Sequence, residues 1–485
     1  MNSTGMKKTH TLHKIYTSSS ALILYLCKKK VNAIDQDTIC ALSTANGMGA
    51  IAVIRVSGKE ALKITSKVFS KNLEEVKSHT ANFGTIRDAE NNVIDEVLVT
   101  VLKEGKSFTG ENTTEIACHG SVFIQRQILS LLLETGCRMA KPGEFTMRAY
   151  FNGRMDLSQA EAIADLISAD SKKGHEIAMN QMRGGYSDHI KHLRQRLMDF
   201  ASLIELELDF SEEDVEFADR SELNKLVDEL KDHLKELTDS FAYGNAIKNG
   251  ISTVIAGRPN AGKSTLLNAL LNEERAIVSD IAGTTRDTIE EQLTIDGVLF
   301  KFIDTAGIRE AKDEIEKIGV ERTISEVGKS NVLLYVFDAV EMTPEEVKQD
   351  IEKLQRKGLS IVLLANKVDQ LKSFDETKYD FPYPIIPISA KEKEGIKEIK
   401  AQLSEEVQKF ASESDTIVIN ARHYEAFSKA LQDIIKVEEA LEMQIPGDLL
   451  AMDIRSAIRH LSSVIGDITE DDLLGNIFAN FCIGK

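Results

Sequence analysis

The pattern of apolar positions divides the chain into stretches of different periodicity, beginning near Asp35. Between about 35 and 156, an apolar run at 51–56 follows a glycine-rich turn and a second run covers 93–101. A helical pattern at 125–135 ends just before Gly136. Strand-length and helix-length segments in one region predict a mixed α/β domain over 35–156.

A long helical periodicity follows over 157–249 and returns over 411–485. Its clearest apolar positions recur three and four residues apart with charged residues between them: Leu223, Leu226, Val227, Leu230, Leu234, Leu237 and Phe241. Such a stripe predicts a helix packed in a bundle.

Between these helical regions, residues 250–410 alternate strand-length apolar runs with helical segments. The runs lie at 251–256, 298–303, 332–337, 360–365 and 384–388. This alternation is typical of a parallel α/β sheet. The predicted fold class is therefore α/β and α, with an α/β domain inserted into a discontinuous helical domain.

The first candidate chemistry follows the run at 251–256. Residues 257–264, GRPNAGKS, match the phosphate-loop pattern G-x-x-x-x-G-K-[ST] and precede a predicted helix. In such a loop, backbone N–H groups and the helix N-terminus bind phosphates, Lys263 reaches the β- and γ-phosphates, and Ser264 binds Mg²⁺. Strand and helix stand where this mechanism needs them, which makes a chance match improbable.

Further motifs follow in the order of a GTPase. Asp304, at the end of the run 298–303, can hold Mg²⁺, and Gly307 allows a backbone N–H to approach the γ-phosphate. Thr285 lies between the phosphate-loop motif and Asp304, and can supply a second Mg²⁺ ligand from a switch loop. Ser389, Ala390 and Lys391 follow the last run and can close a base pocket.

A guanine-specific motif, NKVD, ends the run 360–365. The Asp369 carboxylate can accept hydrogen bonds from N1–H and the exocyclic amine of guanine, groups that adenine does not present there. Taken alone the motif is as consistent with a surface turn. Together with the other motifs it predicts a GTPase.

Residue 308 is isoleucine, where Ras-like enzymes place a water-orienting glutamine. An apolar side chain cannot orient water, so hydrolysis uses another group or is slow until one is supplied. Arg286 and Arg309 are nearby candidates, although both are better explained as loop residues.

The composition of the chain limits the class of protein and the cellular compartment that can be expected. The formal net charge of −18 disfavours a protein that wraps nucleic acid without reading sequence, and the five cysteines are scattered without a CxxC pair. A reducing compartment, the cytoplasm, and no membrane span are therefore expected. Residues 1–34 contain six lysines and no acid. They are interpreted as a disordered or mis-started extension, with a targeting peptide as the alternative.

These motifs, together with SFTGENTTEIACHG at 107–120, KPGEFTMRAYFNGRMDLSQAEAIADLI at 141–167 and the terminal FCIGK, resemble the tRNA-modification GTPases of the MnmE (TrmE) family. The resemblance covers about residues 36–485. It implies an N-terminal folate-binding and dimerisation domain, a discontinuous helical domain and an inserted Ras-like G domain. It also implies a homodimer that acts with an FAD-dependent MnmG-like protein, as a heterotetramer, on the wobble uridine of tRNA.

The resemblance also implies ligands. The GTP-binding residues would be Asn260, Ala261, Gly262, Lys263, Ser264, Thr265, Ser279, Asp280, Ile281, Ala282, Gly283, Thr284, Thr285, Asp304, Thr305, Ala306, Gly307, Asn366, Lys367, Asp369, Ser389, Ala390 and Lys391. Mg²⁺ would be held by Ser264, Thr285 and Asp304. K⁺ would be held by Asn260, Ser279, Ile281 and Thr284, and would act where an arginine finger is missing. Glu316 would orient the attacking water.

For the one-carbon chemistry, the resemblance implies 5,10-methylene-tetrahydrofolate or its 5-formyl analogue, bound by Arg55, Glu115, Arg154 and Lys485. A carboxylate can bind the pterin edge and cations can bind the glutamate tail. Cys482 would be a reactive thiol, although a buried structural cysteine is the alternative.

Two other classes of GTPase remain as alternatives. An assembly GTPase, such as a ribosome-biogenesis factor, would carry a basic RNA-binding module after the G domain, whereas the sequence here continues as helices. A membrane-associated GTPase would rely on the lysine-rich head, which is short.

Overall fold

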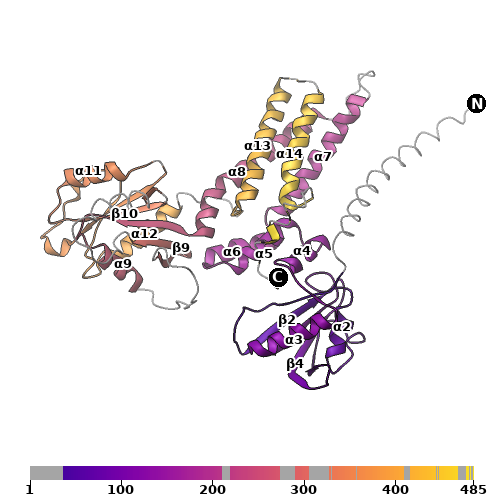
Figure 1. Ribbon diagram of the computed structural model, residues 1–485. Helices are drawn as coiled ribbons and strands as arrows, with labels where there is room; N and C mark the ends of the chain where they lie inside the picture. The colour runs from indigo at the N-terminus through magenta and orange to yellow at the C-terminus, as the bar shows by residue number, and fades with distance from the viewer. Residues whose placement is uncertain are drawn as a thin grey trace, which may run out of the picture. The chain divides into compact units, whose positions relative to one another are not determined.

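The computed structural model describes residues 37–209, 219–272, 290–304, 327–328, 330–356, 358–408, 416–443, 445, 447–467, 474, 477–479, 481 and 484. It divides into two compact units, Met1–Ala164 with Ile465–Lys485, and Asp165–Val464. Figure 1 shows the chain with its elements labelled.

The first unit contains a six-stranded sheet in the order β3-β4-β5-β2-β1-β6. Neighbouring strands are antiparallel, except that β1 and β6 are parallel. The strands are β1 (Ile39–Leu42), β2 (Ile51–Ser57), β3 (Thr80–Arg87), β4 (Val93–Leu102), β5 (Thr113–His119) and β6 (Arg138–Met139).

Two helices, α2 (Ala61–Val68) and α3 (Val122–Thr135), cover one face of this sheet. Their apolar side chains share a core with alternate strand residues such as Ile54, Val99 and Ile116. On the opposite face Ile51, Phe83 and Leu98 are 67%, 60% and 43% exposed. The alternation of buried and exposed positions therefore produces a sheet with one open face that is rich in apolar residues.

The first unit also contains α4 (Glu144–Phe151) and most of α5 (Leu157–Ile167), which crosses the border of the unit after Ala164. Leu157 and Ala160 of α5 pack against Leu474 and Phe478 from the carboxyl end of the chain. The end of the chain thus belongs to the same unit as the N-terminal sheet.

The second unit combines helices and an α/β domain. The helices outside the α/β domain are α6 (Lys172–Met182), α7 (Ser187–Asp209), α8 (Arg220–Asn249), α13 (Ala421–Glu442) and α14 (Gly447–Ile465). The predicted stripe on α8 is confirmed, because Leu223, Leu230 and Leu237 are fully buried. Asp219 caps the start of α8 by accepting hydrogen bonds from two backbone N–H groups.

The α/β domain has a sheet in the order β12-β11-β10-β7-β9-β8, parallel except for β8. Its strands are β7 (Ile251–Ala256), β8 (Glu290–Ile295), β9 (Val298–Asp304), β10 (Val332–Asp338), β11 (Ser360–Asn366) and β12 (Ile385–Pro387). Helices α9 (Lys263–Asn272) and α12 (Ile396–Gln408) pack on one face and α11 (Pro344–Leu354) on the other.

The predicted elements are confirmed here: each of the five apolar runs is a strand, within two residues at either end. Every residue of β10 is buried, as expected for a continuous apolar run in a parallel sheet. The edge strand β8 was not predicted, because its sequence, EEQLTI, contains only two apolar residues.

Candidate functional site

The parallel strands of the α/β domain bring their carboxyl ends to one edge of the sheet. The phosphate-loop motif follows β7, Asp304 ends β9, Asp338 ends β10 and Asn366 ends β11. Ile255 of β7 is the register partner of Asp304. Motifs far apart in the sequence therefore meet at the edge where α/β proteins bind ligands.

The backbone of the phosphate loop depends on two glycines. A Cβ on Gly257 would lie 2.0 Å from the carbonyl oxygen of Val336, and one on Gly262 would lie 2.2 Å from Nδ2 of Asn366. Asn260 has a positive φ of 62°. Only glycine fits at 257 and 262, because any side chain there would clash with these atoms. This explains why the motif requires glycine at both positions.

The predicted phosphate-binding side chains lie at the start of α9. Lys263 Nζ donates to the carbonyl oxygens of Gly257, at 2.8 Å, and Arg258, at 3.0 Å. Ser264 and Thr265 are exposed in the first turn of the helix. The unpaired N–H groups of a helix N-terminus attract anions, so this end of α9 suits a phosphate.

The NKVD motif is hydrogen-bonded to the phosphate loop. Asn366 Nδ2 donates to the carbonyl oxygen of Ala261 at 2.7 Å, and the backbone N–H of Ala390 donates to Asn366 Oδ1 at 3.0 Å. One buried side chain therefore joins three of the predicted segments. Ser389, Ala390 and exposed Lys391 follow the last strand, as predicted, and exposed Asp369 lies on a short 3-10 helix, Val368–Gln370.

Sequence reasoning missed Asp338. Its Oδ2 accepts from Lys367 Nζ at 2.5 Å, and its Oδ1 accepts from the backbone N–H of Val340 at 2.9 Å. Burial acts to raise the pKa of Asp338, but these hydrogen bonds and the charge of Lys367 outweigh it and lower the pKa. The signal in the sequence was an acid directly after the apolar run 332–337.

Several predicted residues lie outside the described residues. They are Ser279, Asp280, Ile281, Ala282, Gly283, Thr284, Thr285, Thr305, Ala306, Gly307, Glu316, Cys482 and Lys485, together with Ile308, Arg286 and Arg309 and the head, 1–34. Among the residues that are described, no group of three or more His, Cys, Asp or Glu could hold a metal ion.

The second candidate site lies on the sheet of the first unit. Arg55 of β2 and Glu115 of β5 are register partners, and Arg55 donates to Glu115 Oε1 from Nε at 3.0 Å and from Nη2 at 2.9 Å. The guanidinium carbon of Arg55 lies 5.5 Å from the ring centre of Phe108 and 5.6 Å from that of Phe145. The rings favour a cation between them.

The third predicted residue, Arg154, contacts the same region through the loop between β4 and β5. Its Nη1 donates to the carbonyl oxygen of Gly105 at 3.2 Å, and Phe108 belongs to this loop. At the other end of the chain, the carbonyl oxygen of Gly484 accepts from Ser43 Oγ at 3.0 Å, just after β1. The structure thus groups Arg55, Glu115 and Arg154 around one loop and places Gly484 in the same unit.

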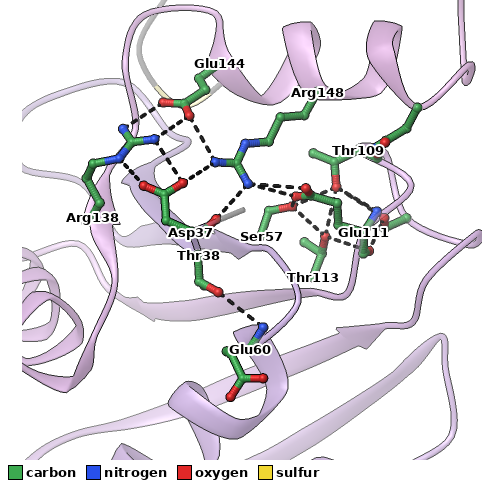
Figure 2. A network of polar contacts seen from close by, with 12 residues as sticks. Asp37, Thr38, Ser57, Glu60, Thr109, Glu111, Thr113, Arg138, Glu144 and Arg148 are labelled. Carbon is green, nitrogen blue, oxygen red and sulfur yellow. Dashed lines mark hydrogen bonds and ion pairs between the residues drawn. The ribbon is translucent and has the colours of Figure 1, made fainter. Parts of the chain in front are cut away.

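A buried ionic network supports this loop (Figure 2). Arg148 of α4 is 1% exposed and donates to Asp37 at 2.8 Å, Glu144 at 3.1 Å and Glu111 at 3.2 Å. Ser57, two residues after Arg55, donates to the other oxygen of Glu111 at 2.8 Å. Through Glu111 the network fixes both the end of β2 and the loop that carries Phe108.

Two acids of this network, Glu144 and Asp37, are held as carboxylates. Burial acts to raise the pKa of Glu144, but hydrogen bonds from Arg138, the backbone N–H of Lys141 and Arg148 lower it overall. The pKa of Asp37 is lowered in the same way, against its burial, by Arg138 and Arg148. The network is therefore charged at neutral pH.

A phosphate loop joined to a guanine motif at the edge of a parallel sheet defines a P-loop GTPase domain, here inserted between helical segments. Residues 38–154 match the family model described as "GTP-binding protein TrmE N-terminus", and residues 157–482 match that of the "MnmE helical domain". The chain belongs to the MnmE family of tRNA-modification GTPases, and is a GTP hydrolase that acts in tRNA modification.

Relatives support this along almost the whole chain. The tRNA modification GTPase MnmE of Cytophaga hutchinsonii is 53% identical over 451 residues, which cover 93% of this chain and 98% of the relative. That of Flavobacterium psychrophilum is 52% identical over 462 residues, covering 93% and 100%. The solved FeoB G-domain from Methanococcus jannaschii is 26% identical over 33% of this chain and 97% of its own, with a TM-score of 0.25.

No helix among the described residues is long and apolar enough to cross a membrane.

Proposed function

We propose that the chain is a potassium-activated GTPase that works with an FAD-dependent, MnmG-like partner. Together they form the aminomethyl or carboxymethylaminomethyl group at C5 of the wobble uridine of tRNA, with a one-carbon unit from a tetrahydrofolate. The observation that carries the proposal is the meeting of the phosphate loop and the NKVD motif through Asn366.

The nucleotide site works through residues already in place. Lys263 exchanges its two carbonyl partners for the β- and γ-phosphates, while the N–H groups of the loop and of the first turn of α9 bind phosphate oxygens. Asp369 accepts hydrogen bonds from the guanine edge. Lys367 of the motif is fixed by its hydrogen bond to Asp338 at the end of β10.

Among the described residues, Ser264, Asp304 and Asn260 are of the residue types that the two proposed cations need. Exposed Ser264 at the start of α9, together with Asp304 at the end of β9, would hold Mg²⁺ with Thr285. The amide of Asn260 would hold K⁺ with Ser279, Ile281 and Thr284. A bound K⁺ would neutralise transition-state charge in place of an arginine finger. Because Ile308 cannot orient water, Glu316 would orient it through a bridging water.

The first unit binds the folate in this proposal. Both hydrogen bonds from Arg55 end on Oε1 of Glu115, so Oε2 can accept from the pterin edge. Arg154 and Lys485 supply positive charge for the glutamate tail. The thiol of Cys482 would take part in the tRNA chemistry.

The open sheet face supports a homodimer through the first unit, because a second copy would cover its exposed apolar residues. The GTPase motifs and the proposed folate residues belong to different units. Hydrolysis therefore acts on the tRNA chemistry through a conformational change.

Two measurements test this function. GTP turnover by the purified protein should be much faster in KCl than in NaCl, and Asn260→Ala should remove the difference; equal rates in both salts contradict potassium activation. In cells that lack the protein, mass spectrometry should show unmodified wobble uridine. The wild-type copy should restore the modification, whereas Glu115→Gln and Cys482→Ser should not, although both keep their GTPase activity.

A further inference from the structure

One arginine of the phosphate loop has a clear structural role and no part in the chemistry described above. Arg258, the second residue of the GRPNAGKS motif, extends its side chain to α11. Its Nε donates to Asp350 Oδ2 at 2.8 Å, and its Nη1 donates to Glu346 Oε1 at 2.7 Å. These contacts connect the loop to a helix 86 or more residues further along the chain.

Both carboxylates are themselves fixed. Tyr335, 2% exposed on β10, donates from its hydroxyl to Asp350 Oδ2 at 2.7 Å. Glu346, the third residue of α11, completes a capping box in which its side chain accepts from the N–H of Thr343 at 3.0 Å. An exposed ion pair between two mobile side chains contributes little, but here only Arg258 has to be ordered when the pairs form.

The position of α11 excludes a direct role of the Arg258 guanidinium at the phosphates. Tyr335 and α11 share the core on one face of the sheet, whereas α9, which begins at Lys263, packs on the other face. The guanidinium is thus held on the α11 side by two carboxylates. It is not available as an arginine finger at the phosphates.

The backbone of Arg258, in contrast, lies within the phosphate-binding machinery. Its carbonyl oxygen accepts from Lys263 Nζ at 3.0 Å and from the N–H of Ala261 at 3.3 Å. Asn366 holds the second half of the loop through Ala261. The ion pairs of Arg258 are the corresponding side-chain support for the first half.

We propose that Arg258 is a positioning residue of the nucleotide site, which holds the first half of the phosphate loop through Asp350 and Glu346 of α11. This inference rests on the proposed nucleotide-binding role of the loop. It assigns to α11 a part in nucleotide affinity, although no residue of α11 belongs to a GTPase motif.

The test compares the affinity of the full-length protein for a fluorescent GDP analogue, and the KM and kcat for GTP, in Arg258→Ala, Asp350→Ala and the double variant. Each single variant should weaken binding and raise KM about fivefold to tenfold, with kcat almost unchanged. The double variant should be no weaker than Arg258→Ala, because both changes remove the same support. Tyr335→Phe should give a smaller loss of the same kind.

Lys353→Ala is the matched control, because Lys353 pairs with the same Asp350 at 3.9 Å from the exposed side of α11. It should leave affinity and KM unchanged. Three results would overturn the proposal: an unchanged affinity in Asp350→Ala, additive losses in the double variant, or a fall in kcat without a rise in KM in Arg258→Ala, which indicates direct catalysis.

The variant Lys263→Ala distinguishes the positioning role of Arg258 from the proposed nucleotide-binding function of the loop. In the same assay it should abolish nucleotide binding whatever the state of Arg258. Binding that survives Lys263→Ala would overturn the nucleotide site itself, whereas loss in Lys263→Ala with normal binding in Arg258→Ala would overturn only the positioning role.

Discussion

The two candidate sites of this protein are built in different ways. The phosphate loop uses backbone: two glycines against neighbouring atoms, a helix N-terminus and the ends of parallel strands. The Arg55–Glu115 site uses side chains from β2, β5, α4 and a loop, supported by a buried ionic network. A site built from backbone groups is encoded by one contiguous motif. A site built from side chains depends on residues that are distant in the sequence and must be charged and buried together.

The strongest test of this contrast is Arg148→Met. It removes the buried cation that pairs with Asp37, Glu111 and Glu144, of which Asp37 and Glu144 keep their second partner, Arg138. Breaking a buried ion pair from one side costs about 3–5 kcal/mol, and the pairs with Arg138 offset part of that cost. We expect amide hydrogen exchange in β2 and β5 to accelerate strongly and folate binding to be lost. Nucleotide binding, in the other unit, should persist.

Arg126→Met is the control for this variant, because Arg126 is exposed on α3 of the same unit. It should change neither hydrogen exchange nor binding. If nucleotide affinity fell together with folate affinity in Arg148→Met, the two sites would not be independent and the contrast would fail.

The next largest effect concerns the base pocket. Asp369→Asn replaces an acceptor with an amide that also donates, so the variant should lose about 100-fold in affinity for GTP through unsatisfied guanine donors. Xanthosine triphosphate, which presents a carbonyl where guanine has its amine, should bind better than GTP. Competition between the two nucleotides measures the change. A variant that still prefers GTP would place the base elsewhere.

What the sequence could predict follows the same division. The five runs of the α/β domain and the helix before Gly136 were predicted, because periodicity and a positive φ at a helix end are local properties. The phosphate loop was predicted from contiguous residues. Arg55, Glu115 and Arg154 came only from resemblance, because each alone is an ordinary charged residue.

Other features could not be predicted from the sequence alone. The ion pairs of Arg148 with Asp37 and Glu111 join residues 111 and 37 positions apart. No periodicity encodes such pairs, which form only when β1, α4 and the loop after β4 come together. Asp338 was missed for a similar reason, since its partner, Lys367, directly follows the next strand, β11.

A smaller, pH-dependent effect is expected at Asp338. Its pKa in the folded protein is below the ordinary value of 3.8, so the carboxylate stabilises the fold above that pH, and this contribution is lost as the pH falls through the lowered folded pKa. Asp338→Asn should cost about 1 kcal/mol at pH 7 and less at pH 2. Urea unfolding followed by circular dichroism at both pH values measures the difference. An equal cost at both would mean that the charge of Asp338 is not what stabilises the motif.

The smallest effect separates the side chains that bind in the first unit from those that support them. Phe108→Leu keeps an apolar side chain beneath Arg55 but removes the ring face, which is worth about 0.5–1 kcal/mol to a cation. Affinity for 5-formyl-tetrahydrofolate, measured by calorimetry, should therefore fall about threefold. Hydrogen exchange in β2 should stay unchanged. Phe123→Leu, on a residue of α3 that is 68% exposed, should change neither. A loss as large as that of Arg148→Met would mean that Phe108 belongs to the support of the site, since a ring that only orients Arg55 cannot control the fold around it.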